Sequence, residues 1–181
     1  QTQLPAGERF DLCRRPTGGG VVDHRDDWTY ALVIPRGHPL EEVRATQSYR
    51  EVHEAQAGAL RLQGIAAVTK SVRAPEAEEA GPAGVCFQRA EIFDVIHEGS
   101  GVKISGAAQK RNKNGLVFQG SISRPALGDP IDWEQFHEDF IAGLARILGA
   151  AAEPVPWPEL NEDEVGALVE HYSTPEWNEF R

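Results

Sequence analysis

The chain has 181 residues, of which 40% are hydrophobic and 25% charged, and this composition is typical of one globular domain with a sizeable core. Its formal net charge of −10 argues against non-specific binding to nucleic acid, which depends on neutralising phosphates. No apolar run approaches the roughly 20 residues that a membrane-spanning helix needs, and no signal peptide opens the chain.

The cysteines and histidines give no sign of a metal site. Cys13 and Cys86 lie far apart, so they form neither a disulfide framework nor a Cys-x-x-Cys pair. The six histidines show no ligand spacing. We therefore expect a cytoplasmic protein without a bound metal ion.

Because the chain begins at Gln1 and contains no methionine, we also expect that an N-terminal segment of the protein is missing.

The first half of the chain predicts a glycine-rich loop, two strands and a long helix. Aromatic and β-branched residues predict a strand over 28–34, which a turn rich in proline and glycine ends. From Glu41 to about Gln63, apolar residues recur at the three-to-four spacing of a helix, and a strand is expected over 65–69. Residues 74–84 are acidic and rich in Pro, Ala and Gly, which is typical of a surface loop.

The second half predicts a block of antiparallel strands followed by two helices. The strands are expected over 92–96, 102–106 and 116–122, with hairpin turns at 99–101 and at Asn114-Gly115. Asp132 is a candidate N-cap for a helix that Gly149 ends. Asn161 is the candidate cap of a second helix, whose predicted buried face consists of Val165, Leu168, Val169 and Tyr172.

This order of elements predicts the fold class. A strand, a long helix, a run of antiparallel strands and two final helices indicate an α+β domain with a mixed, largely antiparallel sheet packed by helices. We expect residues 1–181 to form a single domain.

The glycine-rich stretch 14–24 is the first candidate site. Three consecutive glycines, Gly18–Gly20, favour a backbone with positive φ or one that a ligand approaches closely. Two arginines precede them and His24 follows, and His24 is the histidine with the strongest case for a functional role. The stretch is neither a Walker loop nor a GxGxxG fingerprint. It predicts a cradle for a small molecule or an acyl chain; the alternative is an ordinary glycine-rich connection.

Cys86 and Lys103 form the second candidate site. Cys86 lies between a glycine-rich loop and a predicted strand, and its alternative interpretation is a small buried hydrophobic residue. Lys103 stands 17 residues later, next to the small residues Gly106, Ala107 and Ala108, which leave room for a ligand to reach the ammonium group. A thiol close to such a cation becomes a more reactive nucleophile.

Three motifs, in this order, resemble those of the lipoate–protein ligase and octanoyltransferase superfamily. The first is the stretch 14–24 (RRPTGGGVVDH), the second is 103–109 (KISGAAQ) with the following strand, and the third, weaker one is 172–178 (YSTPEWN). The resemblance runs from about residue 12 to the end. It implies the biotin/lipoate protein ligase catalytic fold, which is like that of class II aminoacyl-tRNA synthetases.

The resemblance also implies roles for individual residues. It places Arg15, Thr17, Gly18, Gly19, Gly20, His24 and Gly106 in the acyl-binding site and makes Lys103 the carbonyl-binding or catalytic lysine. Cys86-Phe87 is similar to the Cys-Phe pair of cysteine-dependent octanoyltransferases, whereas the ATP-using ligases carry an Asn-Asp pair before the lysine strand.

These roles imply an acyltransferase that moves an octanoyl or lipoyl group from acyl carrier protein, through an acyl-Cys86, to a lysine of a lipoyl domain. This reaction needs no cofactor. The first alternative is an ATP-dependent lipoate–protein ligase, which would use ATP and Mg²⁺, and the second is a non-catalytic acyl-binding protein. The expected partners are acyl carrier protein and lipoyl-domain proteins, with no nucleic acid and no membrane.

Overall fold

The computed structural model describes residues 13–72 and 89–179, and the chain divides into two compact units. The larger unit spans Thr17–Ala152, and the smaller one combines Gln1–Pro16 with Glu153–Arg181. Each unit is described here by itself. No helix in the described ranges is long and apolar enough to cross a membrane. That residues 1–181 form a single catalytic domain stays a prediction.

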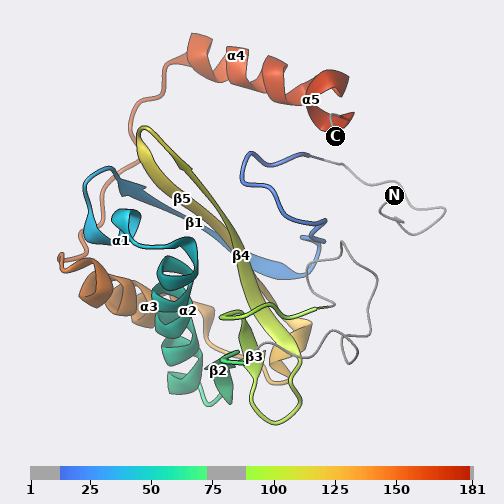
Figure 1. The fold of residues 1–181 in the computed structure, drawn as a ribbon, viewed down its shortest axis with the longest axis vertical. Helices are drawn as coiled ribbons and strands as arrows, with labels where there is room; N and C mark the ends of the chain where they lie inside the picture. The colour runs from blue at the N-terminus through green and yellow to red at the C-terminus, as the bar shows by residue number, and fades with distance from the viewer. Residues whose placement is uncertain (1–12, 73–88, 180–181) are drawn as a thin grey trace. The chain divides into compact units, whose positions relative to one another are not determined.

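The larger unit is built on a five-stranded sheet in which every neighbouring pair of strands is antiparallel (Figure 1). From one edge to the other the strands are β1 (Asp27–Pro35), β5 (Gly115–Ser123), β4 (Lys103–Asn112), β3 (Val95–His97) and β2 (Ala67–Thr69). The long strands β1, β5 and β4 extend over the predicted apolar runs. The predicted α+β class with a largely antiparallel sheet is therefore confirmed.

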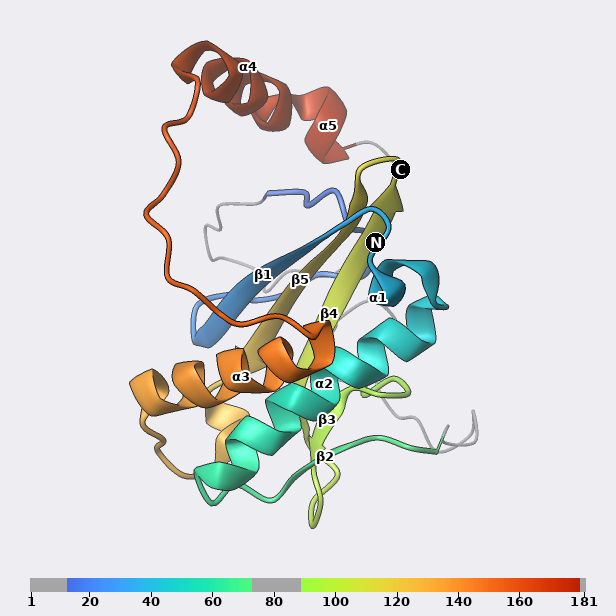
Figure 2. The same ribbon diagram turned by 90° about the vertical axis from the view of Figure 1, so that its left-hand side faces the viewer.

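Two helices, α2 (Ala45–Leu62) and α3 (Trp133–Leu148), cover one face of this sheet (Figure 2). Their apolar faces meet the strands at aromatic contacts, since the ring of Phe118 lies 5.5 Å from that of Tyr49 and the ring of Phe140 lies 5.3 Å from that of Tyr30. The helices approach each other closely at Gly143, where a Cβ atom would lie 3.0 Å from the Cβ of Ala55. The core of the unit lies between the sheet and this helix layer.

The ends of α3 follow the sequence prediction. The Asp132 carboxylate accepts the backbone N–H groups of Glu134 and Gln135 at 3.0 and 3.1 Å, and Gly149 ends the helix with φ 63°. A 3₁₀ turn, η1 (Pro125–Leu127), connects β5 to this helix.

The helix predicted from Glu41 is shorter and begins later. A single turn, α1 (Pro39–Glu42), comes first, and the His38 ring caps it by accepting the N–H of Leu40. Val43 and Arg44 then adopt extended ψ angles of 165° and 148°, so α2 starts only at Ala45. The apolar spacing continues through this two-residue break, and for that reason the sequence pattern did not reveal it.

The smaller unit contains α4 (Glu162–Ser173) and α5 (Pro175–Glu179). Asn161 caps α4 as predicted, with its side-chain oxygen 3.0 Å from the N–H of Asp163. Within this unit the predicted buried face is wrong for three of its four residues, because Val165, Leu168 and Val169 are 39%, 52% and 60% exposed. The fourth, Tyr172, is half-buried and packs against the Trp177 ring.

Gly120 on β5 is expected to tolerate substitution poorly. A Cβ atom there would lie 2.3 Å from a ring carbon of Tyr30, which is packed against α3. Gly120→Ala should therefore lower the free energy of unfolding by about 1–3 kcal/mol, because the buried ring has to move. Urea denaturation measures this. Gly58→Ala within α2 is the control and should be neutral or slightly stabilising; an unchanged stability of Gly120→Ala would contradict the prediction.

Candidate functional site

A β-bulge turns Lys103 away from the helix layer. Val95 pairs with Ser105 while the next residue, Ile96, pairs with Lys103, so β4 carries one extra residue, Ile104. Ile104 and Ser105 are both fully buried. Because of the extra residue, Lys103 shares a sheet face with Gly106 rather than with Ser105, which explains why a Cβ atom at Gly106 would lie only 2.9 Å from the Lys103 ammonium.

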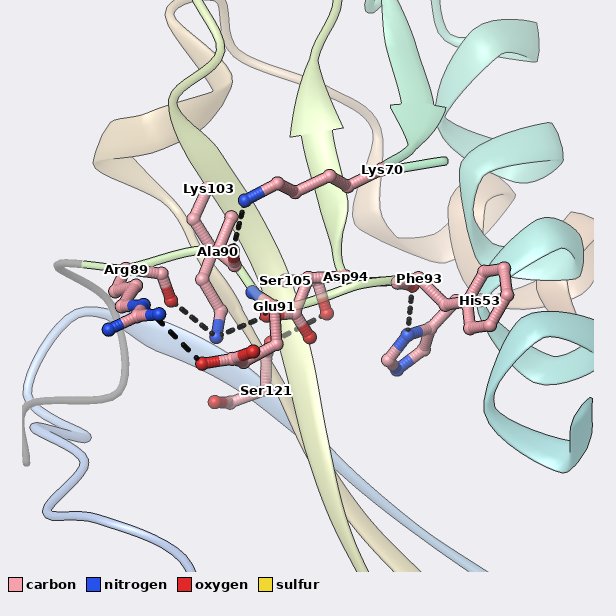
Figure 3. A network of polar contacts seen from close by, with 10 residues as sticks. All are labelled: His53, Lys70, Arg89, Ala90, Glu91, Phe93, Asp94, Lys103, Ser105 and Ser121. Carbon is pink, nitrogen blue, oxygen red and sulfur yellow. Dashed lines mark hydrogen bonds and ion pairs between the residues drawn. The ribbon is translucent and has the colours of Figure 1, made fainter. Parts of the chain in front are cut away.

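Lys103 and Asp94 form a buried ion pair beside Gly106 (Figure 3). The Nζ atom of Lys103 lies 2.7 Å from Oδ2 of Asp94, and the two side chains are only 8% and 9% exposed. Nζ also donates to the carbonyl oxygen of Arg89 at 3.4 Å. A side chain at position 106 would crowd both partners, since its Cβ atom would lie 2.8 Å from Cε of Lys103 and 3.0 Å from Oδ1 of Asp94. The missing side chain of Gly106 thus makes room for the pair.

Asp94 is held by the turn that precedes β3. Its Oδ2 atom accepts the N–H of Glu91 at 2.7 Å, and its own N–H donates to the Glu91 carbonyl at 3.1 Å. Phe93 in this turn has φ 69°, a left-handed conformation that is unusual for a bulky residue. This positive φ interrupts the extended chain, so the strand predicted over 92–96 begins only at Val95. The prediction was too long because no glycine in the sequence marks the positive φ.

Sequence reasoning missed Asp94 as a site residue. Its carboxylate stands nine positions before Lys103, on the other side of the hairpin that joins β3 to β4. A carboxylate and a lysine that flank a short hairpin are brought together by antiparallel pairing, and this signal was present in the sequence.

The glycine-rich loop is anchored on the same face of the sheet. The hydroxyl of Thr17 donates to the side-chain oxygen of Gln119 at 2.9 Å. Gln119 pairs with Ala108, which is two residues beyond Gly106 and so faces the same side. Gly18 and Gly19 have φ angles of 75° and 92°. The structure therefore brings Thr17 to the sheet face that carries Lys103 and Gly106.

His24 contacts a carboxylate at the start of β1. Its Nδ1 atom lies 2.7 Å from Oδ2 of Asp27, whose side chain is 3% exposed. The neighbouring Asp23 binds Arg25 through its side chain, and these hydrogen bonds lower the pKa of Asp23 to about 2. The structure places His24 with Asp27 and not with Lys103.

The beginning of the motif lies in the smaller unit. The N–H of Arg14 donates to the side-chain oxygen of Asn178 at 3.0 Å, and the indole N–H of Trp177 donates to the Arg14 carbonyl at 2.8 Å. The Trp177 and Tyr172 rings also meet edge to face, with the ring centroids 4.9 Å apart. Arg15 belongs to the same unit. Residues 14–16 of the first motif thus lie with the third motif in the smaller unit, while the rest of the first motif belongs to the larger unit. Cys86 lies outside the described residues.

His53 on α2 completes the surroundings of the Asp94 turn. It is 1% exposed, and its Nδ1 atom lies 2.7 Å from the carbonyl oxygen of Phe93. Since a carbonyl only accepts, Nδ1 carries the proton. Burial lowers the pKa of His53, so the folded protein favours the neutral ring.

This buried histidine predicts a loss of stability in acid. The unfolded state binds a proton near pH 6.5 whereas the folded state resists it, so the free energy of unfolding should fall as the pH drops below about 6.5, by at most ~1.4 kcal/mol per pH unit. The measurement is the difference in unfolding free energy between the wild type and His53→Asn from pH 8 to 5, which cancels most other groups. A wild type that gains stability relative to the variant in acid would contradict the prediction.

A family model described as the lipoyl protein ligase A/B catalytic domain matches residues 3–138. The chain belongs to this family. The predicted superfamily is thus confirmed, and the match includes the glycine-rich loop, the Asp94 turn and the Lys103 strand of this lipoyl protein ligase A/B domain.

Several curated relatives of this family member are octanoyltransferases. The octanoyltransferase LipM of Kyrpidia tusciae is 26% identical over an alignment that covers 93% of this chain and 74% of the relative. Those of Bacillus cereus and Staphylococcus aureus are 31% and 30% identical over 64% and 73% of the chain. The chain spans only 42% and 46% of these two relatives.

Solved structures agree on the fold. Lipoate-protein ligase A bound with ATP superimposes with a TM-score of 0.64 at 21% identity, over 92% of this chain and 71% of the other. A bipartite lipoate protein ligase from Thermoplasma acidophilum, described with its E2 lipoyl domain, gives a TM-score of 0.62 at 20% identity, over 92% of this chain and 69% of the other. The predicted biotin/lipoate ligase-like fold is confirmed.

Proposed function

We propose that the chain carries the acyl-transfer centre of an octanoyltransferase that works through Cys86. The observation that supports this most is the buried Lys103–Asp94 ion pair beside Gly106, with the Arg89 carbonyl as a second partner of the lysine. This arrangement fixes a single ammonium group on the sheet face that also anchors the glycine-rich loop.

The connectivity of the chain lets Cys86 reach this ammonium. Arg89, whose carbonyl lies 3.4 Å from the Lys103 Nζ atom, follows Cys86 by three residues. Three residues span at most ~11 Å even when fully extended. The connectivity of the chain therefore permits a Cys86 thiolate and the Lys103 ammonium to act on one substrate carbonyl.

The proposed reaction proceeds in two transfers. The Cys86 thiolate attacks the carbonyl carbon of an octanoyl thioester, and the Lys103 ammonium stabilises the negative charge that develops on the carbonyl oxygen. Collapse of the tetrahedral intermediate breaks the bond to the donor sulfur, which leaves as a thiolate and takes a proton from water. The amine of a lipoyl-domain lysine then attacks the acyl-Cys86 and forms an amide. The cysteine sulfur leaves and recovers the proton that the amine loses.

The glycine-rich loop supplies the proposed acyl site. Thr17 anchors the loop at Gln119, and Gly18, Gly19 and Gly20 carry no side chains that would compete with a hydrocarbon chain for space. Gly106 leaves the space that the Lys103 ammonium occupies beside Asp94, on the same sheet face as this loop. We assign His24 to the same acyl site on the family motif, with Asp27 fixing the orientation of His24. For Arg15 the assignment to acyl binding rests on the sequence motif alone.

The relatives that share this part of the chain support the transferase over the ligase. Those compared are octanoyltransferases by name. In addition, Cys86-Phe87 resembles the Cys-Phe pair of cysteine-dependent octanoyltransferases. The proposed donor is acyl carrier protein, the acceptor is a lipoyl-domain protein in the cytoplasm, and no cofactor takes part. An ATP-dependent ligase would instead join lipoate to the same acceptor with ATP and Mg²⁺.

One assay separates these functions. The complete protein is incubated with an unmodified lipoyl domain and either octanoyl-acyl carrier protein without ATP or lipoate with ATP and Mg²⁺, and the mass of the lipoyl domain is measured. We expect the octanoyl product in the first mixture alone. Product only in the second mixture would establish the ligase instead, and no product in either would leave an acyl-binding protein.

A further inference from the structure

We propose that His53 on α2 is a positioning residue of the acyl-transfer centre: it locks the Phe93–Asp94 turn that aims Asp94 at Lys103. This inference rests on the proposed function, because the ion pair has a catalytic role only if acyl transfer takes place there. His53 does not contact Lys103 itself, so it acts through the turn (Figure 3).

The contact between His53 and the turn is short and sheltered from water. Nδ1 of the imidazole donates to the Phe93 carbonyl at 2.7 Å, and His53 is 1% exposed. The ring also contacts that of Tyr49, one turn earlier in α2, with the ring centroids 5.7 Å apart. The charged groups that act on the ring are Asp94 and Lys103. A buried hydrogen bond from a ring fixed in this way holds the carbonyl in one direction.

The Phe93 conformation needs such a restraint. At φ 69° the backbone of a bulky residue is strained, and surrounding contacts have to maintain it. The N–H of Phe93 donates to the Lys70 carbonyl at 2.8 Å, and the next carbonyl, that of Asp94, accepts the N–H of Lys70 at 2.9 Å. The peptide between Phe93 and Asp94 is held at both ends: its N–H donates to the Glu91 carbonyl at 3.1 Å, and its carbonyl accepts the hydrogen bond from His53.

The direction of the Phe93 carbonyl is coupled to the turn that holds Asp94. This carbonyl and the Asp94 N–H belong to one peptide plane, so rotation of the carbonyl also turns the N–H away from the Glu91 carbonyl, 3.1 Å from it. Oδ2 of Asp94 has to satisfy both Lys103 and the N–H of Glu91, each at 2.7 Å, and this double contact tolerates little rotation. Loss of the His53 hydrogen bond should therefore release the ion pair while the helix layer stays in place.

The test compares four single variants for acyl transfer at a temperature well below their melting points. His53→Leu removes the donor, and His53→Asn restores a donor near the Nδ1 position. Val52→Ala destabilises the core from the next residue of α2 without touching the turn. Phe93→Asn replaces the strained residue by one that accepts positive φ. We expect His53→Leu to lower kcat at least ~10-fold with KM little changed, and the other three variants to stay within ~3-fold of the wild type.

A double variant separates positioning from general destabilisation. In the Phe93→Asn background the turn no longer depends on His53, so the loss from His53→Leu should shrink to less than ~3-fold. An equal loss in both backgrounds, or a loss in Val52→Ala as large as that in His53→Leu, would overturn the proposal.

A measurement that does not use activity distinguishes this proposal from the proposed function. The NMR signal of the Lys103 side chain, identified by its absence in Lys103→Arg, should shift in His53→Leu and return toward the wild-type position in His53→Asn. The same shift of the Lys103 signal is expected even if the complete protein transfers no acyl group. In that case only the proposed function would be contradicted. An unchanged Lys103 signal in His53→Leu would overturn the link between His53 and the ion pair.

Discussion

Lys103→Met is expected to slow formation of the acyl-Cys86 intermediate by about 10²–10³-fold, because one preorganised cation for the developing oxyanion is lost. Methionine keeps most of the side-chain volume, but it leaves the Asp94 carboxylate, which is 9% exposed, without its cation. An unpaired buried charge costs about 3–5 kcal/mol of stability, so the variant should also melt earlier.

The double variant Lys103→Met/Asp94→Asn separates these two effects. Asparagine retains an oxygen that accepts the N–H of Glu91 but carries no charge. The double variant should therefore recover most of the lost free energy of unfolding, but none of the lost rate of acyl-Cys86 formation. Lys110→Met, at an exposed position of the same strand, is the control and should keep the wild-type rate. Stopped-flow or quenched-flow experiments measure the rate of acyl-Cys86 formation in each variant, and thermal denaturation measures its stability. A rate recovered together with stability would mean that Lys103 has only a structural role.

Gly106→Ala is expected to lower kcat/KM by about 10–100-fold, although it adds a single methyl group. That methyl would lie 2.8 Å from Cε and 2.9 Å from Nζ of Lys103, so the ammonium has to leave its place beside Asp94. The lysine end is flexible, and we expect the free energy of unfolding to change by no more than about 1–3 kcal/mol.

Gly99→Ala is the matched control for this glycine. It lies in the hairpin before β4, where a Cβ atom would meet the His97 ring at an ordinary 3.7 Å. Steady-state kinetics on both variants measure the difference. Equal kcat/KM values for Gly106→Ala and Gly99→Ala would show that the position of the Lys103 ammonium does not limit catalysis.

Sequence patterns were sufficient to predict the helices and strands that are determined by local signals. The alternation in β1, the apolar face of α3 and the cap at Asp132 each follow from side chains a few residues apart. The glycine motif and the Lys103 strand likewise identified the family. In these cases local preference and tertiary structure agree.

The parts that sequence reasoning missed depend on contacts between distant segments. The bulge at Ile104 changes which residues share a face with Lys103, and strict alternation would have placed Lys103 with Ser105. The positive φ of Phe93 depends on contacts to Lys70 and His53 from other elements. The helical spacing places His53 with Val52 on the predicted buried stripe, but its contact with the turn is visible only in the fold.

Intact-mass spectrometry of the complete protein incubated with octanoyl-acyl carrier protein tests the central claim most directly. The proposed mechanism predicts one octanoyl adduct that hydroxylamine removes, that is absent in Cys86→Ala and that forms much more slowly in Lys103→Met. No adduct on Cys86 in a protein that still modifies the lipoyl domain would contradict the mechanism and leave Lys103 and Asp94 serving a transfer that needs no acyl-cysteine.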